Sequence, residues 1–262
     1  MSAPALRIAL VQTSLYWEDA AANHDALATK LAPLAGNVDL VVLPEMFPTG
    51  FTMRPEGLAQ PPDGISAHWL RGQARRLDAA VAGSVATRDG ERAVNRLLFA
   101  TPDGNVSRYD KRHLFRMGGE DAHYHPGRDG LVVEWRGLRI APLVCYDLRF
   151  PVFSRRRPDY DYDVLLYVAN WPAPRRDPWR ALLIARAIEN QCYVLGVNRI
   201  GRDGQDLDYA GDSLVVDPRG RVLADASDAD CLLRATLPLD AVREFRDRFP
   251  AHLDADRFTL DG

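Results

Sequence analysis

Three side chains with reactive chemistry each stand close to the end of a strand-like stretch of the chain. Glu45 follows the apolar residues 41–43 and a proline. Cys145 closes the apolar residues 140–144, and Lys111 lies where polar and apolar residues alternate after a predicted hairpin. Because open α/β sheets usually bind ligands beyond the ends of their strands, these positions are candidates for a functional site.

Each of the three residue types suits one step of a covalent hydrolysis. A carboxylate at Glu45 would be partly desolvated, which favours its neutral form and suits a general base. A thiol at Cys145, exposed beside backbone N–H groups, suits a nucleophile. A lysine at Lys111, buried beside a carboxylate, would keep its charge and stabilise a developing oxyanion. Taken singly, Glu45 also fits an exposed loop and Lys111 a salt-bridged surface strand.

The cysteines differ in their surroundings. Cys145 enters a polar turn in which Asp147 and Arg149 follow at once, so a plain core thiol is the weaker interpretation. Cys192 and Cys231 lie in apolar surroundings and are interpreted as small core residues. The three cysteines are odd in number and widely spaced, which predicts neither a disulfide framework nor a zinc site.

Apolar periodicity predicts the elements that must position these residues. Strands are expected at residues 6–12, 38–43, 79–86, 93–101, 106–109, 138–144, 163–169, 193–198, 214–216 and 222–224. Helices are expected at residues 20–35, 65–77 and 239–249, and in a further segment with Asp177 as N-cap and Pro178 at the first helical position. The apolar face of that further helix is predicted to be Trp179, Leu182, Leu183 and Ile188. Strands joined both by helices and by hairpins predict a mixed α/β sheet with helices packed outside.

Composition sets the broad class. The chain has 262 residues, 47% hydrophobic and 26% charged, and no linker-like segment, so residues 1–262 are expected to form one domain. A net charge of -3 argues against nucleic acid as a partner. No apolar run reaches the roughly 18 residues of a membrane helix. With no secretion signal apparent and no disulfide pattern, we expect a cytoplasmic protein.

The order and context of Glu45, Lys111 and Cys145 resemble the Glu–Lys–Cys triad of the nitrilase superfamily of carbon–nitrogen hydrolases. The resemblance extends from the first strand to about Val242. The stretches that support it are 43–45, 109–114, 145–151, 185–190 and 211–213. It implies a four-layer α-β-β-α sandwich, a homodimer formed through one helical face, and neither a metal nor an organic cofactor.

Within that superfamily, residues 45–51, 111–117 and 170–172 look most like bacterial omega-amidases. Those enzymes hydrolyse the side amide of 2-oxoglutaramate and 2-oxosuccinamate to a 2-oxo dicarboxylate and ammonia. The same fold supports nitrilases, N-carbamoyl amidases, deaminated-glutathione-type amidases and acyl transfer, among which fold alone does not choose.

The resemblance also implies a second glutamate after the lysine, which Glu120 matches best, although the neighbouring Asp121 is an alternative. The backbone N–H of Tyr146 is expected to hold the oxyanion together with Lys111. These assignments would complete the catalytic group.

An omega-amide substrate carries a carboxylate at its far end, for which an arginine fork is the preferred partner. Arg149 is the candidate, and a structural salt bridge with Asp147 is its alternative role. Phe51 and Trp171 are expected to wall the pocket, unless they are plain core residues.

Three other functions compete. A Cys–His hydrolase would use His113, His123 or His125 as its base. A metal hydrolase would use His123 and His125, which lie in a Gly-rich loop with no obvious third ligand. A binding protein without activity would be expected to have lost one of the three triad residues, and all three are present.

Overall fold

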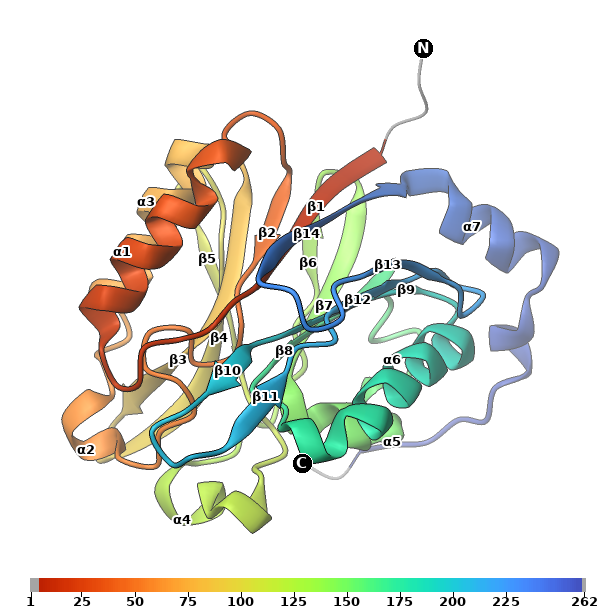
Figure 1. The fold of residues 1–262 in the computed structure, drawn as a ribbon. Helices are drawn as coiled ribbons and strands as arrows, with labels where there is room; N and C mark the ends of the chain where they lie inside the picture. The colour runs from red at the N-terminus through yellow and green to blue at the C-terminus, as the bar shows by residue number, and fades with distance from the viewer. Residues whose placement is uncertain (1–4, 261–262) are drawn as a thin grey trace.

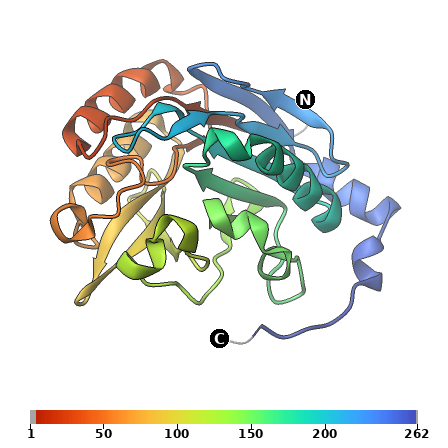
Figure 2. The ribbon, with the colours of Figure 1, turned by 60° about the horizontal axis from the view of Figure 1, so that its bottom comes forward.

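A computed structural model describes residues 5–260, which form two β-sheets stacked between outer layers of helices (Figures 1 and 2). The first sheet has the order β14-β1-β2-β3-β4-β5, and the second has the order β13-β12-β9-β8-β7-β6. A two-stranded hairpin, β10-β11, stands apart from both sheets. The predicted α/β architecture, with mixed sheets and helices outside, is confirmed.

The first sheet combines parallel and antiparallel pairs. Strand β1 pairs in parallel with β2 and β2 with β3, whereas β14, β4 and β5 join their neighbours antiparallel. The bounds are β1 Ala5–Gln12, β2 Leu40–Val42, β3 Ala80–Asp89, β4 Arg92–Ala100, β5 Val106–Asp110 and β14 Cys231–Pro238.

The second sheet has the same mixed character. Its central strands β7, β8 and β9 are parallel, and β6, β12 and β13 are antiparallel to their neighbours. The bounds are β6 Val133–Trp135, β7 Leu138–Val144, β8 Val164–Ala169, β9 Tyr193–Asn198, β12 Leu214–Val216 and β13 Val222–Asp225. The separate hairpin consists of β10 Ile200–Arg202 and β11 Asp208–Ala210.

Helices cover the outer faces of both sheets. In Figure 1, α1 (Ala20–Leu31) and α3 (Ile65–Leu77) lie outside the first sheet, and α5 (Pro151–Ser154) and α6 (Arg176–Asn190) lie outside the second. The remaining helices are α2 Pro55–Leu58, α4 Glu120–His123 and α7 Leu239–Arg248. Short 3₁₀ turns occupy Ala32–Leu34, Arg116–Gly118, Cys145–Arg149, Ala173–Arg175 and Ala251–Asp254.

The alternation of side chains along β1 shows how the layers are held together. Leu6, Ile8 and Leu10 join the large core that includes the second sheet, whereas Ala9 and Val11 join the core beneath α1 and α3. Successive side chains of a strand point to opposite faces, so β1 is apolar on both. This two-sided burial explains why its sequence is an almost continuous apolar run.

Two helix predictions need correction at their ends. The helix expected at residues 20–35 ends at Leu31 and continues as a 3₁₀ turn, since Pro33 has no backbone N–H to donate. Asp177 is not an N-cap and Pro178 is not the first helical residue, because the helix already begins at Arg176, directly after the 3₁₀ turn Ala173–Arg175.

Two side-chain predictions were also wrong. Ile188 is 53% exposed, and the buried face of α6 contains the polar Arg186, whose guanidinium donates to the carbonyl of Leu148. Cys231 is only half-buried, because it lies at the end of the edge strand β14, where a neighbouring strand covers one side alone.

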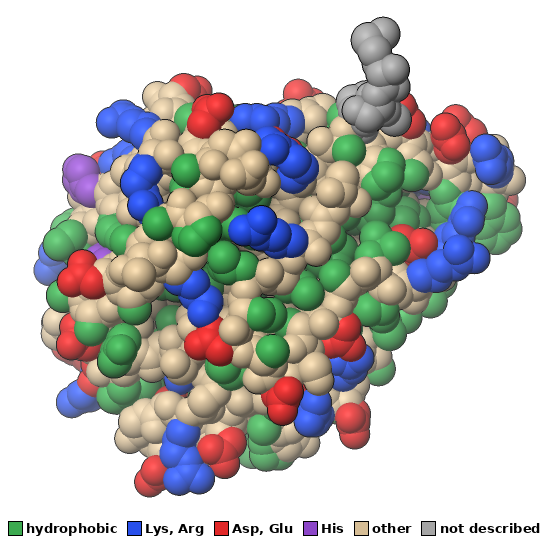
Figure 3. Space-filling model, turned by 45° about the horizontal axis from the view of Figure 1, so that its top comes forward, with side chains coloured by type: hydrophobic (Ala, Val, Ile, Leu, Met, Phe, Trp, Pro, Cys, Tyr) green, Lys and Arg blue, Asp and Glu red, His purple; other side chains and the backbone are tan. Residues whose placement is uncertain are grey.

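The surface carries charges of both signs. On the face shown in Figure 3, Lys and Arg side chains are interspersed with Asp and Glu, and hydrophobic side chains gather towards the side where α7 lies. Within the part of the chain that the structure describes, every helix is too short or too polar to cross a membrane.

Candidate active site

The catalytic candidates meet beside the ends of three strands. Glu45 follows β2, Lys111 directly follows β5, and Cys145 directly follows β7. Glu45, Lys111 and Glu120 are completely buried, and Cys145 is 7% exposed. The structure thus brings together four side chains that are up to 100 positions apart in the sequence.

Lys111 is the centre of this group. Its Nζ lies 2.8 Å from Glu45 Oε1 and 2.9 Å from Glu120 Oε2. Burial by itself lowers the pKa of Lys111, but the charges of Glu120 and Glu45 outweigh it and raise the pKa overall. The lysine is therefore held as an ammonium, which is the form that can stabilise an oxyanion.

Glu120, the second carboxylate on the Lys111 ammonium, is itself held by hydrogen bonds. Its carboxylate accepts hydrogen bonds from the backbone N–H of Phe115 at 2.6 Å and from Asn95 at 3.3 Å. Burial and the nearby charge of Glu45 raise its pKa, while Lys111 opposes them. Asp121 instead forms an ion pair with Arg116 on the surface. Of the two neighbouring acids, only Glu120 contacts the lysine.

Besides Lys111, two asparagines hold Glu45 by hydrogen bonds. Its Oε2 accepts the backbone N–H of Asn170 at 2.8 Å, its Oε1 accepts from Asn95 at 2.8 Å, and its carbonyl accepts from the Asn170 side chain at 2.6 Å. The following residue, Met46, has a φ of 42°, a conformation that L-residues rarely adopt. The carboxylate orientation is therefore determined by contacts on several sides.

Cys145 stands at a sharp bend. Its φ is 45°, and it begins the 3₁₀ turn Cys145–Arg149 directly after β7. Burial, followed by the charge of Glu45 and a hydrogen bond to it, raises the pKa of the thiol well above its ordinary value, and Lys111 opposes this only in part. The sulfur is therefore a neutral thiol at rest, with its proton next to a carboxylate.

A buried carboxylate holds this bend in place. Asp147 accepts the backbone N–H of Val144 at 3.0 Å, the Tyr109 hydroxyl at 2.7 Å and the backbone N–H of His113 at 2.9 Å. The ring of His113 also bonds to it at 2.7 Å and stacks on Phe150. Such strained backbone persists only where its surroundings over-determine it.

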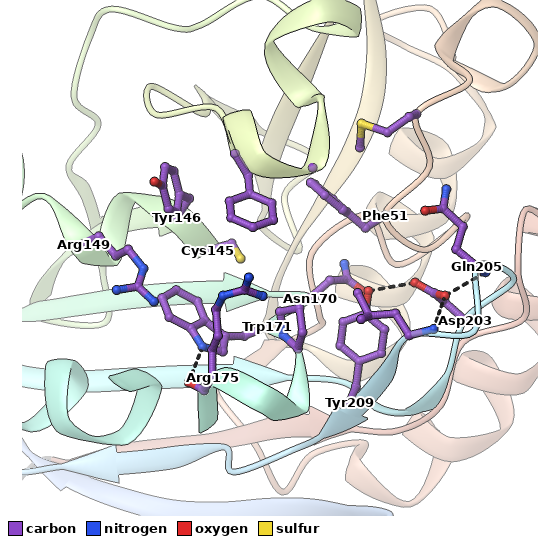
Figure 4. A pocket seen from close by; sticks show the side chains of 15 residues that line it. Phe51, Cys145, Tyr146, Arg149, Asn170, Trp171, Arg175, Asp203, Gln205 and Tyr209 are labelled. Atoms are coloured by element: carbon purple, nitrogen blue, oxygen red, sulfur yellow. Dashed lines mark hydrogen bonds between the residues drawn. The ribbon is translucent and has the colours of Figure 1, made fainter. Parts of the chain in front are cut away.

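Cys145 opens into a pocket with about 630 Å³ of empty space, part of it open solvent (Figure 4). Phe51, Tyr146 and Trp171 line it. The Lys111 ammonium lies 5.1 Å from the centre of the Phe51 ring, and the Arg149 guanidinium lies 4.9 Å from that of Trp171. Aromatic walls with a few charged groups are typical of sites for small organic molecules.

Arg149 lies in the pocket wall and not in a salt bridge with Asp147. Asp147 takes its hydrogen bonds from the groups described above, and none of the ion pairs among residues 5–260 includes Arg149. A second arginine, Arg175, lines the same pocket and lies above the ring of Phe115. Sequence reasoning had not singled out Arg175.

The histidines of the competing functions lie elsewhere. His113 is engaged by Asp147, and His123 and His125 line a separate polar cleft beside α2 and α4. The ring of His125 contacts Arg92. Residues 5–260 contain no group of three or more His, Cys, Asp or Glu side chains arranged to hold a metal ion.

Sequence reasoning missed Asn95 and Asn170 as parts of the site. Asn95 bridges the two glutamates, and Asn170 fixes Glu45 through its backbone and its side chain. The sequence did offer a signal for both residues, namely an asparagine in or directly after an apolar strand. A buried amide needs hydrogen-bond partners, so such an asparagine indicates a polar site.

The comparisons with known proteins agree with this geometry. The carbon-nitrogen hydrolase family matches residues 7–247, so the chain belongs to that family and is an enzyme of the class that cleaves carbon–nitrogen bonds. It is 50% identical to Omega-amidase YafV of Escherichia coli strain K12, over 98% of this chain and 99% of that protein.

Two further relatives are informative. The 2-oxoglutaramate amidase of Bacillus subtilis strain 168 is 38% identical over 83% of this chain and 85% of its own length. The crystal structure of XC1258 from Xanthomonas campestris, a CN-hydrolase superfamily protein with an arsenic adduct in its active site, is 50% identical with a TM-score of 0.95, and the match covers 98% of this chain and 99% of that one. The predicted likeness to carbon–nitrogen hydrolases, and among them to omega-amidases, is confirmed.

Proposed function

We propose that this chain hydrolyses the omega-amide of small 2-oxo dicarboxylic acid monoamides, such as 2-oxoglutaramate and 2-oxosuccinamate, through a thioester on Cys145. The observation that carries the proposal is a buried cysteine, a buried glutamate and a buried lysine gathered beside one pocket that also contains two arginines. The names of the relatives, omega-amidase and 2-oxoglutaramate amidase, support the same substrate class.

The first half of the reaction forms the thioester. Glu45 removes the thiol proton of Cys145 as the sulfur attacks the amide carbon. The carbonyl oxygen becomes an oxyanion, which Lys111 and the backbone N–H of Tyr146 stabilise. Glu45 then returns the proton to the nitrogen, the C–N bond breaks, and ammonia leaves.

The second half releases the acid. Glu45 removes a proton from a water molecule, which attacks the thioester carbon and forms a second oxyanion at the same two donors. The carbon–sulfur bond breaks and the proton returns to Cys145. Glu120 also bonds to the Lys111 ammonium, and this second carboxylate is proposed to keep the lysine from transferring its own proton to the base.

Arg149 and Arg175 are proposed to bind the far carboxylate of the substrate. Arginine matches a carboxylate with two parallel N–H donors, and both guanidinium groups border the pocket. Arg149→Ala should lower kcat/KM for 2-oxoglutaramate by roughly tenfold or more, the range of charge-assisted hydrogen bonds, and should change hydrolysis of an uncharged aliphatic amide little. An equal loss on both substrates would assign Arg149 a structural role.

The function is tested by ammonia release from a panel of omega-amides, plain amides, nitriles and N-carbamoyl compounds. We expect the 2-oxo monoamides to have the highest kcat/KM. A higher value for a nitrile or an N-carbamoyl compound would replace the proposed substrate class by that one.

We also propose that the enzyme is a cytoplasmic homodimer and that residues 1–262 act as one domain. Val152 on α5 and Ile188 on α6 are each 53% exposed, and their helices are neighbours on the outer face of the second sheet (Figure 2). Burial of such side chains against a second copy would stabilise a dimer. The three cysteines are free thiols, which suits a reducing compartment.

A further inference from the structure

The end of the pocket opposite Arg149 is formed by the β10–β11 hairpin. Asp203, Gln205 and Tyr209 of this segment line the pocket. In Figure 4, Arg149 and Asp203 lie at opposite ends of the view, with Cys145 between them. The pocket therefore has a cationic end and an acidic end.

The carboxylate of Asp203 is held in place by groups of its own hairpin. It accepts the backbone N–H groups of Gln205 at 2.8 Å and Leu207 at 3.1 Å, and the hydroxyl of Tyr209 at 2.9 Å. None of the ion pairs among residues 5–260 includes it. The other acids of the hairpin, Asp206 and Asp208, are paired with Arg202.

Arg199 packs against the Tyr209 ring in this wall. Its guanidinium is completely buried, lies 4.6 Å from the centre of the Tyr209 ring and does not line the pocket. A group entering this end of the pocket would therefore meet the Asp203 carboxylate before the guanidinium.

The segment that holds Glu45 also contacts this acidic end. Asn170 bonds to Glu45, the proposed proton donor to the nitrogen, and also lines the pocket. Pro172, two residues further along the chain, pairs with Tyr209. Burial, the charge of Asp203 and, more weakly, that of Glu45 raise the pKa of Tyr209. Tyr209 therefore lies within electrostatic reach of both carboxylates.

Building on the proposed amidase function, we propose that Asp203 and Tyr209 form a subsite for the leaving amine, which accepts ammonium or a cationic N-substituent and disfavours an anionic one. Once the C–N bond has broken, the released ammonia takes up a proton from solvent, and the resulting ammonium is attracted by a nearby carboxylate. The Asp203 carboxylate also repels the far carboxylate of the substrate. That substrate group would therefore bind at the opposite end of the pocket, beside the arginines. Asp203 would thus orient the substrate as well as select the leaving group.

The test compares three amides of 2-oxoglutarate that differ only in the group on the amide nitrogen: N-(2-aminoethyl), N-(2-hydroxyethyl) and N-(carboxymethyl). For each, kcat/KM is measured, or Ki against 2-oxoglutaramate where there is no turnover. The enzymes are the wild type, Asp203→Asn and, as the matched control, Asp206→Asn. The control removes one charge from the same hairpin at a position outside the pocket.

We expect the wild type and the control to prefer the cationic amide over the anionic one by roughly tenfold or more, and Asp203→Asn to reduce that ratio to about one. An unchanged ratio in Asp203→Asn, no preference in the wild type, or neither turnover nor inhibition by any substituted amide would overturn the subsite. Ammonia release from 2-oxoglutaramate itself tests the proposed function separately, because that substrate carries no substituent on the nitrogen.

Discussion

At the scale of single residues, the site is governed by the sharing of one ammonium between two carboxylates. All three groups are completely buried, so their mutual attraction offsets a large desolvation cost. Burial, and after it the charge of Glu45, raises the pKa of Cys145 and keeps the thiol protonated. Attack by the sulfur and transfer of its proton to Glu45 are therefore proposed to occur in one step, in contrast to thiol enzymes that hold a thiolate at rest.

Replacing Lys111 by methionine should cost stability as well as activity. The change leaves two buried carboxylates without their cation, which costs roughly 3–5 kcal/mol, and removes an oxyanion donor worth about 2.7–4 kcal/mol of the barrier. Urea unfolding and ammonia release measure the two effects. Lys30→Met is the control, since Lys30 and Asp230 form a surface pair worth less than about 1 kcal/mol. Equal stability losses in both variants would contradict the account.

The pH dependence of Cys145 alkylation should move with the charge of Glu45. Iodoacetamide reacts with the thiolate, and the raised pKa of Cys145 means that the thiolate appears only at a pH above the ordinary range. Glu45→Gln removes one of the charges that raise this pKa, so the rise in alkylation rate should shift to lower pH. Peptide mass mapping separates Cys145 from Cys231. The exposed Glu134→Gln should leave the profile unchanged, and an unshifted profile in Glu45→Gln would refute the coupling.

At the scale of elements, the bend after β7 connects the core to the nucleophile. Asp147 links these elements, because its carboxylate accepts hydrogen bonds from β7, from the end of β5 and from the loop that follows β5. The position of the sulfur therefore depends on a residue that does not touch the substrate pocket.

Asp147→Asn should weaken the bend and slow the reaction. The amide keeps the shape of the carboxylate but turns one acceptor into a donor that faces N–H and O–H groups, at a cost of about 1–3 kcal/mol in unfolding free energy. We expect kcat to fall while KM changes less, since the pocket walls remain. Asp159→Asn, which alters an exposed pair with Arg157, is the control. Full kcat with normal stability would show that the bend does not need this carboxylate.

The elements themselves were largely predictable from the sequence. Continuous apolar runs predicted ten of the fourteen described strands to within a few residues, because buried strands need apolar side chains on both faces. Strands β6, β10, β11 and β14 were not predicted, since each of them has at most one buried residue. Glu45, Lys111, Cys145 and Glu120 could be named from the motifs around them. Helix ends were less predictable, as the 3₁₀ turn before Arg176 shows.

The supporting residues of the site depend on strand register and could not be predicted. Asn95 is close to Lys111 only because β4 pairs with β5, so that the Lys111 N–H donates to the Asn95 carbonyl at 2.9 Å. Asp203 enters the pocket only because the β10–β11 hairpin folds over it. Neither the pairing of β4 with β5 nor the position of the β10–β11 hairpin can be read from a single sequence.

At the scale of the whole molecule, the outer helices of the second sheet leave apolar side chains exposed. Val152→Arg should shift the proposed homodimer towards monomer, because it places a charge in a surface that would be desolvated. Sedimentation equilibrium measures the shift. Ile65→Arg on α3, where the residue is also exposed but the helix covers the first sheet, is the matched control. Equal effects of the two changes, or a monomeric wild type, would contradict the proposed interface.

The central claim is that amide cleavage proceeds through an acyl group on one sulfur. Acid-quenched enzyme mixed with excess 2-oxoglutaramate, followed by intact mass and peptide mapping, tests it most directly. The account predicts a thioester on the peptide containing Cys145 in the wild type, and neither adduct nor ammonia release in Cys145→Ala. Ammonia release by Cys145→Ala at the rate of the wild type would contradict it.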